Sequence, residues 1–431
     1  MEDKPNIFLF VMDTARKKNL SAYSYERETT PFLKSCAKKG FKFENAVANS
    51  IWTYPSHVSM FTGMYPHEHG RLSKYDRGEI LHKSFIEKHL TDYKSIAISN
   101  NAWISSVFGF DTFFDRFSMN DDSEYFFEEA TLIREFERRE EDWDSALKKY
   151  GSFVWESIKR KEAKSLLNGA DYIFNQKFLN KITSEEFWSD DGAKEVLQEI
   201  SSMDFDAKDP KFTFVNFIEP HSPYAPPKEF FNKFCERDIE EFKELVDTPP
   251  WKFIGEDSDR KEEILIDFYD ASLRYMDHML KEIHDDVESS TERDNVFIFV
   301  GDHGEMFNND GLWSHGGGFR KEVLNIPVIV KGYEQGEESR LFELREIGRL
   351  VKSIVENERL DFGVEEAYSD YLGLNSHILD EDKIPEGYDS PKVAKINMSG
   401  ELEVASSLSK SDGKMKEHLR ALKMKKNRNN I

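Results

Sequence analysis

Short apolar runs recur along the chain and are separated by polar turns and amphipathic segments. Residues 6–12 are apolar on both faces and too short for an isolated helix, so they predict a buried, parallel strand that ends at Asp13. Four later runs predict further buried strands: 95–99, 212–218, 296–300 and 326–330. Residues 30–40 instead have apolar positions at helical spacing, with Thr30 before Pro31 at the start. Strands that alternate with such helices predict an α/β fold with a layered sheet.

Two segments interrupt this series of strands and helices. Residues 121–200 are strongly charged and helical in pattern, and they predict an insertion that is either a solvated helical hairpin or a cover over a site. Residues 409–431 are rich in Lys and Arg and predict a basic tail that frays, docks on its own chain or meets an anionic partner. We therefore predict a main domain over residues 1–335, which contains the insertion, and a smaller C-terminal subdomain over residues 336–408.

The composition limits the classes of protein that fit. The chain has 431 residues, 39% of them hydrophobic, which is enough for a sizeable core. Acidic side chains outnumber basic ones 82 to 59, and the net charge of −23 argues against nucleic acid as a partner. No apolar run approaches the ~20 residues of a membrane-spanning helix, and the first residues show no secretory signal, so we expect a cytoplasmic protein. Cys36 and Cys235 predict reduced thiols, not a disulfide framework.

The stretch over residues 49–70 is rich in hydroxyl and imidazole side chains. Pro55 predicts the opening of a helix that runs to about Thr62, which places the Thr53 hydroxyl beside the N-terminus of that helix. Free N–H groups and the positive end of the helix dipole attract an anionic tetrahedral group there, so this hydroxyl is placed to attack phosphorus or sulfur. A helix cap without chemistry is the alternative interpretation of this stretch alone.

Carboxylate and imidazole side chains follow two of the predicted strands. Asp13 comes after the first strand, and Asp302 and His303 come after the fourth. Ligand sites of α/β proteins gather at the carboxyl ends of strands. Together with the Thr53 oxygen, these groups make a plausible four-ligand site of nitrogen and oxygen, which suits zinc or manganese better than calcium.

With these residues in place, the chain resembles the sulfatase branch of the alkaline phosphatase superfamily. Asn6 to Arg16 resembles the first strand of the family with its Asp-Thr-x-Arg, and Thr53 to Gly63 resembles the Cys/Ser-x-Pro-Ser-Arg…Thr-Gly signature. Further motifs follow in the order of the family: Pro220 to Tyr224, Tyr269 to Ala271 with Tyr275 and Asp277, Gly301 to Glu305, and Trp313 to Pro327. Several separated motifs in order, over roughly residues 5–332, make the resemblance specific. It implies a mixed, mainly parallel β-sheet sandwiched between helices, with a small C-terminal subdomain.

The departures from the family pattern decide the chemistry that the resemblance implies. Sulfatases need a Cys or Ser that is oxidised to formylglycine, and Thr53, a secondary alcohol, cannot give that aldehyde. A phosphothreonine can instead be opened by water at phosphorus, as relatives with Thr or Ser nucleophiles imply. His57 replaces the signature Arg, and Asp302-His303 replaces the usual Asp-Asn. We therefore expect one divalent ion, zinc or manganese with calcium or magnesium as alternatives, held by four residues: Asp13, Thr53, Asp302 and His303.

The resemblance also implies roles for other polar residues. His221 and His315 match family positions that contact the anionic group of the substrate and protonate the leaving oxygen. We expect His57 to contact the substrate, and Asn101 either to line the substrate pocket or to make a turn.

Two further histidines, His67 and His69, are spaced like a pair of metal ligands. The family places this pair outside its metal site. We therefore interpret both residues as structural.

The predicted function is hydrolysis of a phosphate mono- or diester through a covalent intermediate on Thr53. The alternatives are hydrolysis of an organic sulfate, a phosphoethanolamine-type phosphotransfer, and a non-catalytic module that binds an anion. The expected partner is a small anionic ester. Its organic part and the oligomeric state of the protein stay open.

Overall fold

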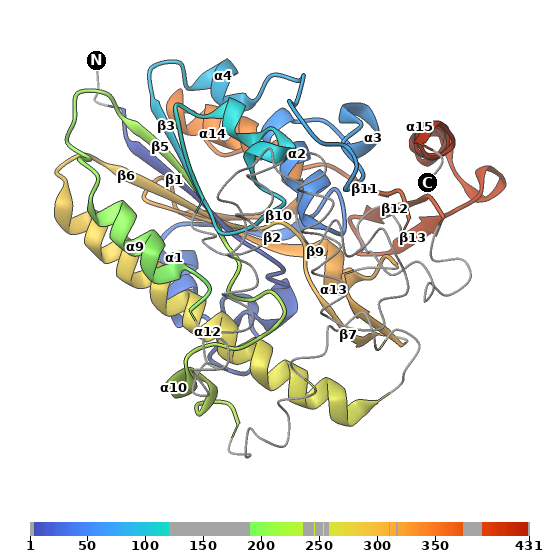
Figure 1. The fold of residues 1–431 in the computed structure, drawn as a ribbon, viewed down its shortest axis with the longest axis horizontal. Helices are drawn as coiled ribbons and strands as arrows, with labels where there is room; N and C mark the ends of the chain where they lie inside the picture. The colour runs from blue at the N-terminus through green and yellow to red at the C-terminus, as the bar shows by residue number, and fades with distance from the viewer. Residues whose placement is uncertain are drawn as a thin grey trace, which may run out of the picture. The chain divides into compact units, whose positions relative to one another are not determined.

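An eight-stranded sheet forms the centre of the computed structural model, which describes residues 4–119, 190–235, 245, 253, 258–309, 311–315, 318–373 and 390–429. Its strand order is β10-β2-β9-β6-β1-β5-β3-β4 (Figure 1). The strands are β1 (Asn6–Met12), β2 (Phe41–Val47), β3 (Lys94–Ser99), β4 (Arg116–Met119), β5 (Lys211–Phe217), β6 (Asn295–Gly301), β9 (Asn325–Lys331) and β10 (Gly336–Glu343). Only β9 runs antiparallel to its neighbours in this sheet. The predicted mixed, mainly parallel sheet is confirmed.

Helices cover both faces of this sheet. Figure 1 shows α2, α4 and α14 on one face, and α1, α9 and α12 on the other. The α-helices within the described residues are α1 (Pro31–Lys39), α2 (Thr53–Thr62), α3 (Pro66–His69), α4 (Phe85–His89), α9 (Ala193–Ser201), α10 (Lys228–Phe231), α12 (Asp259–Ser290), α13 (Lys321–Leu324), α14 (Ile347–Val355) and α15 (Gly413–Asn429).

Strand β1 is buried along its whole length because it lies between these two helical layers. Ile7 and Leu9 pack in the core that α2 and α14 complete. Phe8 points to the opposite face, where its ring stacks on that of Phe297 with the centroids 4.9 Å apart. Apolar and polar residues do not alternate in this segment because the strand is covered on both sides.

The main sheet extends beyond the boundary that we predicted after residue 335. β10 pairs with β2 at the edge of the sheet, and the buried residues of α14 belong to the main core. The pattern did not predict β10 because half of its residues are exposed and two of these, Glu337 and Arg340, are charged, as is common at sheet edges.

A second sheet of three antiparallel strands follows: β11 (Glu366–Tyr371), β12 (Lys392–Asn397) and β13 (Leu402–Ala405). α15 packs against this sheet through Met415, Leu419 and Leu422, all of which are buried. The basic segment near the C-terminus thus docks on its own chain. A two-stranded sheet, β7 (Met306–Asn309) with β8 (Leu312–Ser314), lies just after β6 in the sequence.

Residues 121–189 of the predicted insertion lie outside the described residues. The predicted role of the insertion as a cover therefore stays a prediction. Cys36 and Cys235 are buried and are not in a disulfide. No helix in the described parts of the chain has the length and the apolar composition needed to cross a membrane.

Candidate active site

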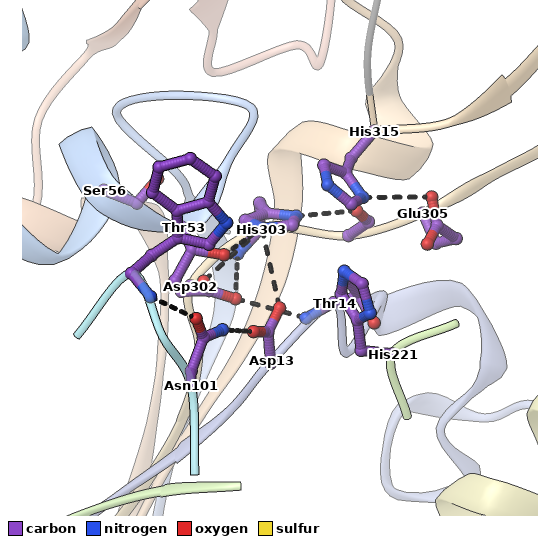
Figure 2. Close-up of polar contacts among 12 residues, drawn as sticks. Asp13, Thr14, Thr53, Ser56, Asn101, His221, Asp302, His303, Glu305 and His315 are labelled. Carbon is purple, nitrogen blue, oxygen red and sulfur yellow. Dashed lines mark hydrogen bonds and ion pairs between the residues drawn. The ribbon is translucent and has the colours of Figure 1, made fainter. Parts of the chain in front are cut away.

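Two aspartates meet at the carboxyl edge of the main sheet because β1 and β6 are parallel neighbours. Met12 pairs with Gly301 at the end of these strands, so Asp13 and Asp302 leave the sheet side by side. Both carboxylates and the adjacent His303 are completely buried. One ligand atom from each of the three residues lies within 4.8 Å of the others. Figure 2 shows these side chains and Thr53 pointing toward one another.

Thr53 reaches this cluster from the first turn of α2. The helix begins at Thr53 itself, two residues earlier than the sequence predicted. Pro55 is tolerated at the third helical position because the N–H that it lacks would have no partner within the helix there. Gly63 ends the helix in the left-handed conformation, as predicted. The Thr53 Oγ1 lies 3.3 Å from the Nε2 of His303.

The orientation of His303 leaves a ring nitrogen facing the carboxylates. Its Nδ1 lies 3.0 Å from the carbonyl of Gly304 and donates to it, so Nε2 presents a lone pair. Nε2 lies 3.4 Å from an oxygen of Asp302 and 3.7 Å from an oxygen of Asp13. Burial lowers the pKa of His303 to about 4, and the ring is neutral at pH 7.

The two carboxylates are poorly compensated by the protein. Oδ1 of Asp13 and Oδ2 of Asp302 are buried and have no hydrogen-bond partner. Burial raises the pKa of Asp13 to about 6 and that of Asp302 to about 7, and for Asp13 the neighbouring carboxylate adds to the effect. Two unpaired carboxylate oxygens, an imidazole lone pair and a hydroxyl converge on one point. The donor set therefore fits a divalent cation.

The remaining carboxylate oxygens are held by the protein. Asn101 donates a hydrogen bond from its side-chain amide to Oδ2 of Asp13 and accepts one from the backbone N–H of Trp103, at 2.8 Å. Backbone N–H groups of Thr14 and His303 donate to Oδ1 of Asp302, at 3.2 and 2.8 Å. Both polar atoms of the Asn101 side chain are thus used within the protein. It orients Asp13 and makes a local turn, which was the alternative interpretation, and the expected contact with substrate stays a prediction.

His57 lies behind Thr53 in the protein interior. Its side chain is fully buried, its Nδ1 donates to the carbonyl of Thr53 at 2.9 Å, and its Nε2 lies 3.3 Å from the amide of Asn216. Burial lowers the pKa of His57 to about 3, so the ring is neutral. We expected this residue to contact the substrate. Both ring nitrogens have protein partners, through which His57 supports the first turn of α2, and the expected contact with substrate stays a prediction.

His221 and His315 lie next to the cluster. The ring of His315 lies 4.6 Å from that of His303 and 5.4 Å from that of His221, measured between centroids. Figure 2 shows both rings on the same side of Asp13 and His303. The structure thus brings together both predicted histidines with Asp13, Thr53 and the Asp302-His303 pair. Two of the three glycines that follow His315, at 316 and 317, lie outside the described residues.

Glu305 is a site residue to which sequence reasoning gave no role. Its buried side chain places Oε1 3.4 Å from the Nδ1 of His315, and its Oε2 accepts a hydrogen bond of 3.0 Å from the hydroxyl of Tyr224. Burial lowers the pKa of His315, but the ion pair with Glu305 outweighs this effect and raises it overall. The only sequence feature that could have indicated Glu305 as a site residue is its place in the Asp-His-Gly-Glu motif at a strand end.

The Tyr and Asp residues of α12 that match family motifs have structural contacts. The hydroxyl of Tyr269 donates to the carbonyl of Thr14 at 2.7 Å and accepts from the N–H of Arg16 at 2.8 Å. Asp277 accepts hydrogen bonds of 2.9 Å from the N–H groups of Phe32 and Leu33 in the first turn of α1. These residues brace the loop after Asp13 and the start of α1 and do not enter the site.

Comparison with known proteins identifies the family and supports the fold. The family model described as Sulfatase matches residues 5–345. An uncharacterised sulfatase of Escherichia coli K12 is 22% identical over 364 residues, which cover 78% of this chain and 64% of the relative, so the chain spans less than two thirds of its length. Phosphonate monoester hydrolase from Silicibacter pomeroyi has a similar structure, with a TM-score of 0.61 at 12% identity over 99% of this chain and 95% of that one. The C-terminal periplasmic domain of EptC from Escherichia coli, in complex with zinc, has a TM-score of 0.51 at 14% identity over 82% and 83%. The chain belongs to the sulfatase family, whose members are ester hydrolases of the alkaline phosphatase superfamily.

Proposed function

We propose that this chain is a metal-dependent hydrolase of a phosphate mono- or diester, with Thr53 as the nucleophile. One observation carries the proposal: the hydroxyl of Thr53, at the start of a buried helix, lies beside an imidazole lone pair and two unpaired carboxylate oxygens. A threonine at this position cannot form the aldehyde of a sulfatase. It can accept and release a phosphoryl group.

Asp13, Thr53, Asp302 and His303 would hold the cation. The mixture of nitrogen and oxygen donors favours zinc or manganese over calcium or magnesium. Zinc in the similar EptC domain supports this choice. When bound, the cation supplies a positive charge that lowers the pKa of the Thr53 hydroxyl and attracts the anionic ester.

Different side chains of the site carry out the successive steps of the reaction. The Oγ1 of Thr53 attacks phosphorus, so an oxygen to phosphorus bond forms and the bond to the ester oxygen breaks. The departing oxygen needs a proton, and His315 or His221 is placed to donate it from the same side of the cluster. Water next attacks the phosphorus on Thr53, which restores the hydroxyl and releases phosphate from a monoester substrate or a phosphate monoester from a diester.

Glu305 and Asn101 act by positioning other groups. The ion pair between Nδ1 of His315 and Glu305 orients the ring and turns its Nε2 away from the glutamate. Asn101 fixes one oxygen of Asp13 and leaves the other for the cation. His57 ties the carbonyl of Thr53 to the interior and so fixes the start of α2.

Hydrolysis of an organic sulfate is the second candidate, because the curated relative named above is a sulfatase. Its mechanism would differ, since a sulfated Thr53 would have to be hydrolysed directly. A phosphoethanolamine-type transfer and a non-catalytic anion site remain further alternatives, and the cytoplasmic location stays a prediction.

The deciding experiment compares esters of one aryl alcohol as phosphate monoester, phosphate diester and sulfate. The protein is stripped with a chelator and then supplied with Zn²⁺ or Mn²⁺, with Thr53→Ala as the matched control. We expect turnover of a phosphate ester that needs the metal and Thr53. A clear preference for the sulfate would overturn the substrate assignment, and equal turnover by the stripped protein would overturn the metal requirement.

A further inference from the structure

A second cluster of imidazole and carboxylate groups lies away from the candidate active site. It joins His67 of α3, Asp370 of β11 and His418 of α15, and one ligand atom from each lies within 4.8 Å of the others. Asp370 and His418 are buried and His67 is partly buried. The three elements contact one another in pairs, and Figure 1 shows them on the same side of the molecule.

The three side chains converge through the atoms that bind metals. Nδ1 of His67 lies 2.7 Å from Oδ2 of Asp370, and Nδ1 of His418 lies 2.9 Å from Oδ1. The two imidazole rings lie against each other with their centroids 3.9 Å apart. Donors bound to one tetrahedral zinc ion at about 2.0 to 2.2 Å lie about 3.3 to 3.6 Å apart, so each ring nitrogen would move away from Asp370 by less than about 1 Å to admit the ion. Two nitrogens and one carboxylate also match the donor preference of zinc.

Burial of this polar group within an apolar interface needs a compensating interaction. The surrounding core consists of Tyr65, Leu72, Tyr368, Leu372, Val393, Ala405, Met415, Leu419 and Leu422. A buried carboxylate and a buried imidazole are costly in such surroundings unless they are paired or bind a metal. Hydrogen bonds among the three residues supply part of the compensation, and a shared cation would supply more.

We propose that His67, Asp370 and His418 form a structural zinc site that is separate from the catalytic cluster. The ion replaces the two Nδ1 hydrogen bonds to Asp370 with coordination by the same atoms, and water completes the coordination sphere from the partly exposed side of His67. The site has no hydroxyl nucleophile among its ligands. Its effect is therefore on stability.

Asp370 also contacts the segment that leads to the nucleophile. The N–H of Asp370 donates to the carbonyl of Asn49 at 2.9 Å, and the hydroxyl of Ser50 donates to the carbonyl of Asp370 at 3.0 Å. Asn49 and Ser50 belong to the segment that leads into α2 and Thr53. Zinc at this cluster would thus fasten the C-terminal helix to the segment that positions the nucleophile.

Zinc content and thermal stability test the proposal without reference to turnover. His418→Gln and His67→Gln each remove a ligand but leave an amide that can donate to Asp370, so they distinguish a metal site from a cluster held by hydrogen bonds alone. Asp302→Asn removes the catalytic cation, and His89→Gln, in a histidine of α4 outside both clusters, is the control. Each protein is dialysed against Zn²⁺, freed of excess metal and analysed for bound zinc.

We expect one equivalent of zinc in Asp302→Asn and none when His418→Gln or His67→Gln is added to it. Zinc should raise the melting temperature of Asp302→Asn and of Asp302→Asn with His89→Gln, since an ion bound only to the folded state stabilises it. It should not raise that of Asp302→Asn combined with His418→Gln or His67→Gln. Failure of Asp302→Asn to bind zinc, or equal zinc in all of these variants, would overturn the second site. Neither result bears on phosphate turnover, which tests the proposed function separately.

Discussion

The two His and carboxylate clusters of this protein use the same residue types and differ in how their charges are compensated. At the carboxyl edge of β1 and β6, one oxygen of Asp13 and one of Asp302 have no partner. In the second cluster, both oxygens of Asp370 accept hydrogen bonds from imidazole nitrogens. The first cluster therefore needs a cation to be complete, whereas the second persists without one and gains stability from one.

The surroundings of the clusters explain this difference. The first lies where parallel strands end together, a position that brings like charges close and leaves room for a ligand. The second lies in an interface between a helix and a sheet, where each group reaches its partner directly. In this protein, the two carboxylates of the first cluster, each with one oxygen that lacks a hydrogen-bond partner, lie in the candidate active site. The carboxylate whose oxygens are both hydrogen-bonded, Asp370, instead holds three elements of the fold together.

Replacement of Thr53 should have the largest effect. Thr53→Ala removes the attacking oxygen and should lower turnover by about 10³-fold or more, while Thr53→Ser keeps part of it. Acid-quenched wild-type reactions should contain a phosphoryl group on Thr53, which mass spectrometry of the peptide detects. Turnover near the wild-type level in Thr53→Ala would mean that water attacks the ester directly.

Loss of the proton donor should have the next largest effect. His315→Ala should slow esters with poor leaving groups by roughly 10²-fold and spare activated aryl esters, because only a basic leaving oxygen needs protonation. Glu305→Gln should give a smaller loss of the same kind, since it leaves the ring in place but weakens its orientation. Equal losses for both classes of ester would assign His315 to anion binding.

The two clusters should respond to pH in opposite directions when no metal is bound. Burial raises the pKa of Asp13 and of Asp302 in the folded state, so their contribution to stability is present below about pH 4 and is lost as the pH rises toward 7. Burial also acts to raise the pKa of Asp370, but hydrogen bonds from His418 and His67 lower it overall, so its contribution is present at neutral pH and is lost in acid.

Chemical unfolding of the chelated protein at pH 5 and pH 8 measures this contrast. Asp302→Asn should stabilise the protein at pH 8, by on the order of 2 kcal/mol, and should have less effect at pH 5. Asp370→Asn should destabilise the protein at both values. A stabilising effect of Asp302→Asn that does not depend on pH would show that its charge is compensated without a metal.

The smallest effect on turnover should come from the second cluster. His418→Gln should leave the rate per folded molecule within about 2-fold of wild type and should lower the melting temperature in the presence of zinc, because the site contacts no reacting atom. Steady-state kinetics and thermal unfolding on the same preparation measure both quantities. A loss of turnover as large as that of His315→Ala would place this cluster in the catalytic machinery.

The sequence pattern was sufficient for features that depend mainly on neighbouring residues in the chain. The buried strands at 6–12 and 296–300 were predicted because short runs that are apolar on both faces fit a covered parallel strand. Asp13 and Asp302 followed as a pair, because parallel strands end at one edge of a sheet. The place of Thr53 before Pro55 suggested a hydroxyl at a helix start, and its role followed only with Asp13, Asp302 and the family resemblance; the helix begins at Thr53 itself.

Only the tertiary structure decided where the ambiguous polar residues point. His57 and Asn101 are near the nucleophile and a strand end in sequence, yet both turn their polar atoms toward protein groups, because the direction of a side chain depends on what packs against it. Glu305 acquires a role only when the fold brings His315 to it. His67, Asp370 and His418 come from segments far apart in the chain, so no pattern in the sequence could predict their contact. Their convergence depends on the docking of α15, which a hydrophobic interface determines and which only the folded chain contains.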